Sequence, residues 1–181
     1  MNNVAFSKFL ALILRHDPSV VGLRLKDEGW VNVDELIHGV NTKSNFKIDF
    51  STLESIVAAD NKGRYSFDEN MENIRANQGH SIKVNMTFEE LMIPPSLPLY
   101  HGTNEKALAS ILKNGISKMS RHHVHLTNDR EMAYKVGSRR GKGIVLRISA
   151  ELMFFEGHKF YRSENGVYLT DNVPANRLVV D

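Results

Sequence analysis

Arginine and histidine side chains lie in short polar segments of this chain, where they could bind phosphate. Arg15 and His16 follow an apolar helical pattern, and Arg75 lies in a polar, turn-forming stretch. Arg139 lies in a glycine-rich stretch with several other basic residues. The planar guanidinium group binds phosphate bidentately and stays charged at working pH, and a histidine can also move a proton. Together these four side chains could form a pocket for a phosphate with two negative charges.

Each of these side chains also has a plainer explanation. Basic residues at the C-terminal end of a helix, such as Arg15 and His16, offset the helix dipole. Arg75 alone would be a surface residue. The basic run within residues 117–147 is explained as readily by a solvated face as by a phosphate patch. Residues 1–92 carry a net charge of −3 and residues 93–181 a net charge of +5, which sum to the +2 of the chain.

Other kinds of site have weaker support in the sequence. His122, His123 and His125 lie close together, but the chain has no cysteine and no HExxH motif, so we predict no metal site. Segment 137–143 is rich in glycine, but it follows a predicted helix and precedes a predicted strand. A phosphate-binding P-loop needs the opposite order, so this class of nucleotide site is excluded.

A proline-rich segment divides the chain. Three of the five prolines fall within residues 94–98, a density that no helix or central strand accepts. We therefore predict two lobes, residues 1–92 and 99–181, joined by a linker over residues 93–98.

Each half predicts its own elements. In the N-terminal half, apolar spacing predicts three helices, the first capped by Ser7, followed by a hairpin of residues 64–67 and 73–76. The C-terminal half predicts helices and the strands of a small mixed sheet. There Asp129 is expected to cap one helix and Gly115 to end another.

The composition, 41% apolar and 24% charged, is that of a folded globular protein. The N-terminal apolar run lacks a basic leader and reaches Arg15 before any small-residue cleavage site, so we expect no signal peptide. No stretch approaches the roughly 18 apolar residues of a membrane span. We expect a soluble, cytoplasmic monomer.

Six short motifs occur in order along the chain. They are Leu14-Arg15-His16-Asp17-Pro18 with Gly29-Trp30-Val31, Ile74-Arg75-Ala76-Asn77-Gln78-Gly79-His80-Ser81, Tyr100-His101-Gly102-Thr103, His123-Val124-His125-Leu126, Val136-Gly137-Ser138-Arg139, and Ser163-Glu164-Asn165-Gly166-Val167-Tyr168-Leu169-Thr170. In this order and spacing they resemble the RNA 2′-phosphotransferase family, NAD-dependent enzymes that remove an internal 2′-phosphate from RNA. The resemblance covers nearly the whole chain, from about Phe6 to Leu178.

The resemblance implies an α+β fold with an N-terminal winged-helix lobe and a C-terminal ADP-ribosyltransferase-like mixed-sheet lobe. The catalytic tetrad of the family falls on four residues of this chain: Arg15, His16, Arg75 and Arg139. Arg139 is chosen over Arg140 because it follows the Val-Gly-x sequence. The NAD-binding residues of the family fall on a second set: His101, Gly102, Thr103 and His125.

The implied reaction has two steps and needs no metal. In the first, the RNA 2′-phosphate attacks the anomeric carbon of the NAD ribose and nicotinamide leaves, which gives 2′-phospho-ADP-ribosylated RNA. In the second, the ribose 2″-hydroxyl attacks that phosphate, which releases RNA with a free 2′-hydroxyl and ADP-ribose 1″,2″-cyclic phosphate. The arginines and His16 would stabilise charge on the phosphoryl oxygens. We therefore expect NAD as co-substrate and, as partner, a tRNA-like RNA from splicing that carries an internal 2′-phosphate.

Two other functions stay open at this point. One is an ADP-ribosyltransferase that caps terminal nucleic-acid phosphates, which product analysis would distinguish. The other is a non-enzymatic winged-helix protein that binds nucleic acid. The acidic balance of residues 1–92 argues against the second, because duplex binding usually needs a basic lobe.

Overall fold

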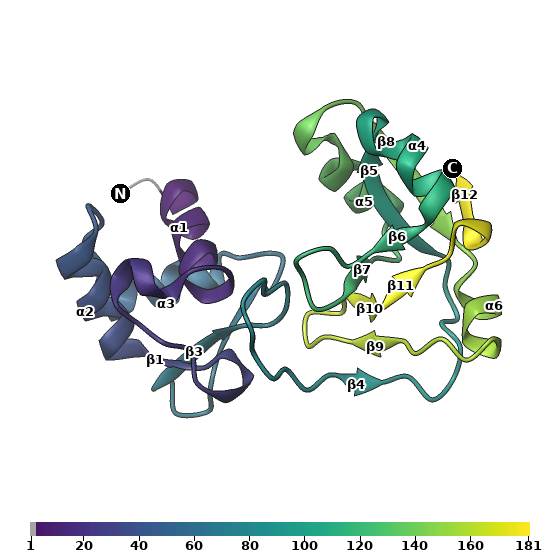
Figure 1. The fold of residues 1–181 in the computed structure, drawn as a ribbon. Coiled ribbons are helices and arrows are strands. Elements are labelled where there is room, and N and C mark those ends of the chain that lie inside the picture. The colour runs from purple at the N-terminus through teal and green to yellow at the C-terminus, as the bar shows by residue number, and fades with distance from the viewer. Residues whose placement is uncertain (1–2) are drawn as a thin grey trace. The chain divides into compact units, whose positions relative to one another are not determined.

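The computed structural model describes residues 3–181 (Figure 1). The chain forms two compact units, Met1–Thr87 (unit 1) and Phe88–Asp181 (unit 2). The proline-rich segment 93–98, expected as a linker, belongs to unit 2 in this division. None of the described helices is long and apolar enough to cross a membrane.

Unit 1 combines helices with a small antiparallel sheet (Figure 1). Its elements are α1 (Asn3–Arg15), the 3₁₀ helices η1 (Pro18–Val21) and η2 (Asp27–Gly29), β1 (Val31–Asn32), α2 (Val33–Lys43), α3 (Phe50–Ala58), β2 (Tyr65–Phe67) and β3 (Asn73–Ala76). Strand β3 lies between β1 and β2 and pairs antiparallel with both. The expected hairpin is confirmed, with Tyr65 opposite Ala76.

An apolar core joins the helices of unit 1 to this sheet. Phe6, Leu10 and Ile13 repeat at helical spacing along one face of α1 and are fully buried. On β3, Ile74 belongs to the same core, and successive side chains of a strand point to opposite faces. The next residue, Arg75, is therefore directed away from the face that Ile74 covers.

Side-chain caps begin α2 and α3. The Oδ1 atoms of Asn32 and Asp49 accept hydrogen bonds from backbone N–H groups three residues on, at 3.1 and 2.8 Å. The expectation that Ser7 caps the first helix is wrong, because α1 begins at Asn3 and includes Ser7. The Ser7 hydroxyl instead accepts a hydrogen bond from Arg64 at 3.2 Å, a contact between residues far apart in sequence.

Unit 2 is richer in strands. Its elements are β4 (Glu89–Glu90), β5 (Leu99–Asn104), α4 (Glu105–Asn114), β6 (Ile116–Ser117), β7 (Val124–Leu126), α5 (Arg130–Gly137), the 3₁₀ helix η3 (Ser138–Arg140), β8 (Gly143–Ile148), α6 (Ala150–Phe155), β9 (Tyr161–Arg162), β10 (Tyr168–Thr170), β11 (Asn172–Val173), the 3₁₀ helix η4 (Ala175–Arg177) and β12 (Leu178–Val180). Asp129 caps α5 by accepting a hydrogen bond from Met132 N at 2.9 Å, and Gly115, with φ of +79°, ends α4. Both predictions for these helix ends are confirmed.

The strands of unit 2 form small sheets in the orders β4-β9-β10-β7, β11-β6 and β12-β8-β5. Every pairing among these described strands is antiparallel, so the expectation of a mixed sheet is wrong. Two parallel strands need a long crossover connection between them, whereas antiparallel strands do not. The longest ladder joins β5 to β8 over the six residues Leu99–Asn104. This ladder holds β5 firmly against β8.

Candidate functional site

The end of α1 carries Arg15 and His16, the first two predicted site residues. Asp17 ends the helix by turning to cap η1, where its Oδ1 accepts a hydrogen bond from Ser19 N at 3.1 Å. His16 Nδ1 lies 2.8 Å from Ser81 Oγ, and Ser81 N donates a hydrogen bond to Arg15 O at 2.9 Å. These contacts bind the loop that follows β3 to the end of α1.

Arg15 is held over the sheet by β2. Its Nη2 donates a hydrogen bond to the carbonyl oxygen of Arg64 at 3.4 Å, and its guanidinium carbon lies 5.9 Å from the centre of the Tyr65 ring. The same carbonyl accepts a hydrogen bond from Asn77 N at 2.9 Å. Arg64, which directly precedes β2, therefore positions both the Arg15 side chain and the start of the loop over residues 77–81.

Arg75 extends from β3 and is largely buried, with 9% of its surface exposed. Its Nη1 donates a hydrogen bond to Glu28 Oε2 at 2.8 Å, and its guanidinium carbon lies 4.5 Å from the centre of the Trp30 ring. Hydrogen bonding to the Thr87 side chain and the contact with Arg75 outweigh desolvation and hold the pKa of Glu28 below its usual range. Glu28 is thus an ionised partner of Arg75.

Two of the sequence motifs pack against each other in unit 1. His80 is 2% exposed and lies so close to Gly29 that a Cβ on that glycine would be 3.0 Å from His80 Nε2. Gly79 has a φ of +88°, a left-handed conformation that favours glycine. The segment from Arg75 to Ser81 therefore reaches both η2 and the end of α1. Unit 1 gathers three of the predicted site residues, Arg15, His16 and Arg75, on these connected elements.

In unit 2, His101 on β5 and His125 on β7 are neighbours. His101 Nδ1 lies 3.1 Å from the backbone oxygen of His125, which only accepts hydrogen bonds, so Nδ1 carries the proton. Burial lowers the pKa of His101, more than the bond to His125 raises it. The ring is therefore neutral near pH 7, and its Nε2 is a hydrogen-bond acceptor.

Glycines let β5 and α5 approach backbone to backbone. A Cβ on Gly102 would lie 1.8 Å from the carbonyl oxygen of Ala133, and a Cβ on Gly137 would lie 2.3 Å from the carbonyl oxygen of Thr103. Thr103 itself is 7% exposed. The predicted residues Gly102 and Thr103 thus lie at the contact between the strand and the helix that leads to Arg139.

Arg139 lies in η3, directly after α5, and its side chain is exposed. Arg139 interacts electrostatically with Arg121. Desolvation lowers the pKa of Arg121, and the positive charge of Arg139 lowers it further. Arg121 Nη1 also lies 3.2 Å from His125 Nδ1. Unit 2 therefore brings together His101, His125, Arg121 and Arg139, of which Arg121 was not predicted.

The sequence held weak signals for the residues that were missed. Arg121 was counted only within a basic run, and a turn that closes with its N–H on Lys118 O at 3.0 Å brings it back towards His125. Glu28 directly precedes the Gly-Trp-Val motif. It has a left-handed φ of +58°, a conformation that glutamate rarely adopts and that the sequence therefore does not predict. Trp30 was noted as part of that motif, without its contact to Arg75.

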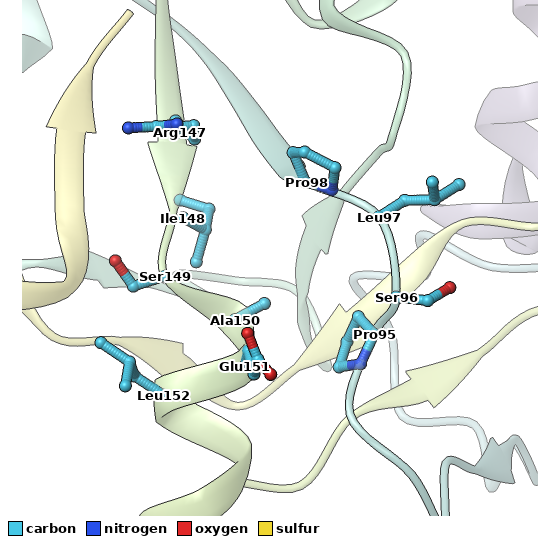
Figure 2. A pocket seen from close by; sticks show the side chains of 10 residues that line it. All are labelled: Pro95, Ser96, Leu97, Pro98, Arg147, Ile148, Ser149, Ala150, Glu151 and Leu152. Atoms are coloured by element: carbon cyan, nitrogen blue, oxygen red, sulfur yellow. The ribbon is translucent and has the colours of Figure 1, made fainter.

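Two further features lie outside these clusters. Within residues 3–181, no group of three or more His, Asp or Glu side chains is arranged to hold a metal ion. Unit 2 has a pocket of about 370 Å³. Residues 95–98 and 147–152 line it (Figure 2). It contains none of the predicted site residues.

The structure is that of an α+β protein, with arginine and histidine side chains gathered in each of its two units. The family model described as RNA 2′-phosphotransferase, Tpt1 / KptA family, matches residues 1–172, and the chain belongs to this family. The resemblance proposed from the motifs is confirmed, and the chain is an enzyme of the transferase class.

Curated relatives agree with this assignment over nearly their whole length. A protein of Fusobacterium nucleatum subsp. nucleatum is 52% identical over 175 residues, which are 96% of either chain. One of Trichormus variabilis is 48% identical over 97% of this chain and 94% of its own, and one of Flavobacterium johnsoniae is 47% identical over 96% and 94%. Each is named "Probable RNA 2'-phosphotransferase".

Proposed function

We propose that this enzyme removes an internal 2′-phosphate from RNA by transferring it to the ADP-ribose part of NAD. The observation that carries the proposal is the family match over residues 1–172. It is supported by the basic clusters at the matching motifs in both units. In this proposal NAD is a co-substrate, consumed in each turnover, and no metal takes part.

We assign unit 1 to the winged-helix class and make it the lobe that binds the RNA phosphate. Its order of helix, short strand, two helices and hairpin supports this assignment. Unit 2 is assigned as the ADP-ribosyltransferase-like lobe that binds NAD. Its small antiparallel sheets, with His101 and His125 on neighbouring strands, support that assignment.

Arg15, His16 and Arg75 bind the 2′-phosphate in the first step. The phosphate is already an anion and needs no base to become a nucleophile, so these residues act by holding it against the anomeric carbon. An oxygen of the phosphate forms the new bond to carbon, and the bond from carbon to the nicotinamide nitrogen breaks. The nicotinamide leaves with the bonding electrons, which neutralise its positive charge.

His101, Gly102, Thr103 and His125 bind the NAD. The neutral His101 accepts a hydrogen bond at Nε2, as a ribose hydroxyl or a carboxamide N–H requires. Gly102 keeps the backbone of β5 close to α5. We add Arg121 to this set, because a guanidinium beside His125 is suited to the diphosphate of NAD.

The second step breaks the bond between phosphorus and the RNA 2′-oxygen. The ribose 2″-hydroxyl attacks phosphorus and loses its proton, while the RNA 2′-oxygen leaves and gains one. The arginines of the tetrad, Arg139 included, stabilise the charge on the phosphoryl oxygens. We assign the proton transfer to His16 Nε2, and the contact of His16 Nδ1 with Ser81 Oγ supports this assignment.

Product analysis tests this function. The protein is incubated with NAD and a short RNA that bears one internal 2′-phosphate, and all products are identified by mass spectrometry. We expect RNA with a free 2′-hydroxyl, nicotinamide and ADP-ribose 1″,2″-cyclic phosphate in equal amounts, and no reaction without NAD.

A matched RNA with only a terminal phosphate separates the alternatives. A stable ADP-ribose cap on this RNA, with the internal 2′-phosphate left in place on the first, would identify a capping ADP-ribosyltransferase. RNA binding without release of nicotinamide would identify a non-enzymatic binder.

A further inference from the structure

Two side chains from one turn hold the guanidinium group of Arg75. Glu28 Oε2 accepts a hydrogen bond from Nη1 at 2.8 Å, and the ring of Trp30 lies 4.5 Å from the guanidinium carbon. The carboxylate fixes one edge of the planar group, and the indole covers a face of it. With 10% of the Arg75 side chain exposed, its orientation is set by this turn.

The turn itself has an unusual backbone. Glu28 has a φ of +58°, in the left-handed region that favours glycine, asparagine or aspartate, and Gly29 follows with a φ of +80°. Lys26 N donates to Trp30 O at 2.8 Å and Gly29 N donates to Lys26 O at 3.0 Å, so the turn is closed by its own backbone. Such an outlier persists where the surroundings fix it, and here the side chain is bonded to Arg75 and Thr87.

We infer that Glu28 and Trp30 are positioning residues, which orient Arg75 for its contact with the RNA 2′-phosphate. The inference rests on the proposed role of Arg75. A guanidinium has five N–H donors in one plane, so it can hold a carboxylate and a phosphate at the same time. A carboxylate that fixes this plane before the substrate arrives aligns the group with the phosphoryl oxygens and reduces the freedom lost on binding.

Glu28→Asn and Glu28→Gln separate positioning from a structural role. Asparagine tolerates the left-handed backbone but is too short to replace Glu28, and glutamine keeps the length but not the charge. We expect Glu28→Asn to unfold at the wild-type temperature or above, while both variants lower kcat about tenfold, since a charge-assisted bond to Arg75 is lost. Glu54→Gln, the same charge change on the exposed face of α3, should behave as wild type.

Trp30 provides a second, spectroscopic test. It is the only tryptophan, so its fluorescence reports directly on the surroundings of Arg75. A short RNA with one internal 2′-phosphate should change this emission in the wild type, less in Glu28→Gln and not in Arg75→Ala. Trp30→Phe, which keeps an aromatic face, should retain more activity than Trp30→Leu.

The outcomes distinguish this inference from the proposed function. If Arg75→Ala turns over 2′-phosphorylated RNA at the wild-type rate, the role of Arg75 fails and the inference falls with it. If Arg75→Ala is inactive but both Glu28 variants keep wild-type kcat and the wild-type fluorescence response, the inference alone is overturned. Loss of kcat in Glu28→Asn together with a lower unfolding temperature would also overturn it, in favour of a structural role.

Discussion

Replacing Gly102 with alanine introduces one methyl group where the backbones of β5 and α5 touch. The new Cβ would lie 1.8 Å from Ala133 O, 2.7 Å from Ala133 C and 2.9 Å from Gly137 N. Ordinary contact begins at 3.4 Å, so the carbonyl must move by about 1.6 Å. These three atoms belong to the backbone, and no flexible side chain can yield instead.

Strand β5 is not free to yield either, because it pairs with β8 over all six of its residues. Overpacking of a well-packed interior typically costs about 1–3 kcal/mol, and a backbone clash belongs at the upper end or beyond. We therefore expect Gly102→Ala to lower the free energy of unfolding by about 3 kcal/mol or more. The shift of α5 should also displace Arg139, which directly follows this helix, so the second step of the reaction should slow.

Denaturation in urea, followed by far-UV circular dichroism, measures this loss. Gly157→Ala is the matched control in the same unit: no atom lies within 4 Å of its Cβ, but its φ of +89° is unfavourable for alanine. Its cost should be about 1 kcal/mol, from the backbone alone. A Gly102→Ala variant no less stable than Gly157→Ala would refute the close approach of β5 and α5.

Three other predictions concern the second step of the reaction, the binding of RNA and the protonation of His101. Arg139→Ala should accumulate RNA that carries 2′-phospho-ADP-ribose, seen as a slower band on a gel, because one lost phosphate contact slows the second step by about 10²–10³. Arg140→Ala, the matched neighbour, should act as wild type, and the reverse result would move the role by one residue. Affinity for 2′-phosphorylated RNA should fall with salt, with a log–log slope of about −1.5 to −3 for two to four phosphate contacts, and a slope near zero in filter binding would contradict an arginine-lined site. Burial lowers the pKa of His101, so as the pH falls the unfolded chain protonates this histidine at a higher pH than the folded chain does. The free energy of unfolding should therefore decrease as the pH drops below about 6.5. Urea denaturation at pH 7 and pH 5 should show a smaller fall for His101→Gln, and an equal fall would contradict a neutral, buried His101.

Local signals in the sequence predicted local structure well. Asp129 caps α5 and Gly115 ends α4 through contacts within three or four residues, so the sequence contains both partners side by side. Ser7 has the residue type of a cap, but its partner Arg64 lies 57 positions away. The division of the unit 2 strands into small antiparallel sheets also depends on distant partners, which apolar alternation does not identify.

The same limit applies to the candidate site. Arg15 and His16 could be singled out because a helix visibly ends there, before Asp17-Pro18. The partner of Arg75 is Glu28, 47 residues earlier, in a backbone conformation that its residue type disfavours. Only the folded chain shows that contact.

The most direct test of the central claim, NAD-dependent transfer of the 2′-phosphate, follows the phosphate itself. RNA with a radioactive internal 2′-phosphate is mixed with excess enzyme and NAD, and quenched samples are separated by chromatography. We predict that the label passes first into an RNA-bound ADP-ribose species and then into ADP-ribose 1″,2″-cyclic phosphate, with none released as inorganic phosphate. Label that appears as inorganic phosphate, or that leaves the RNA without NAD, would contradict the claim.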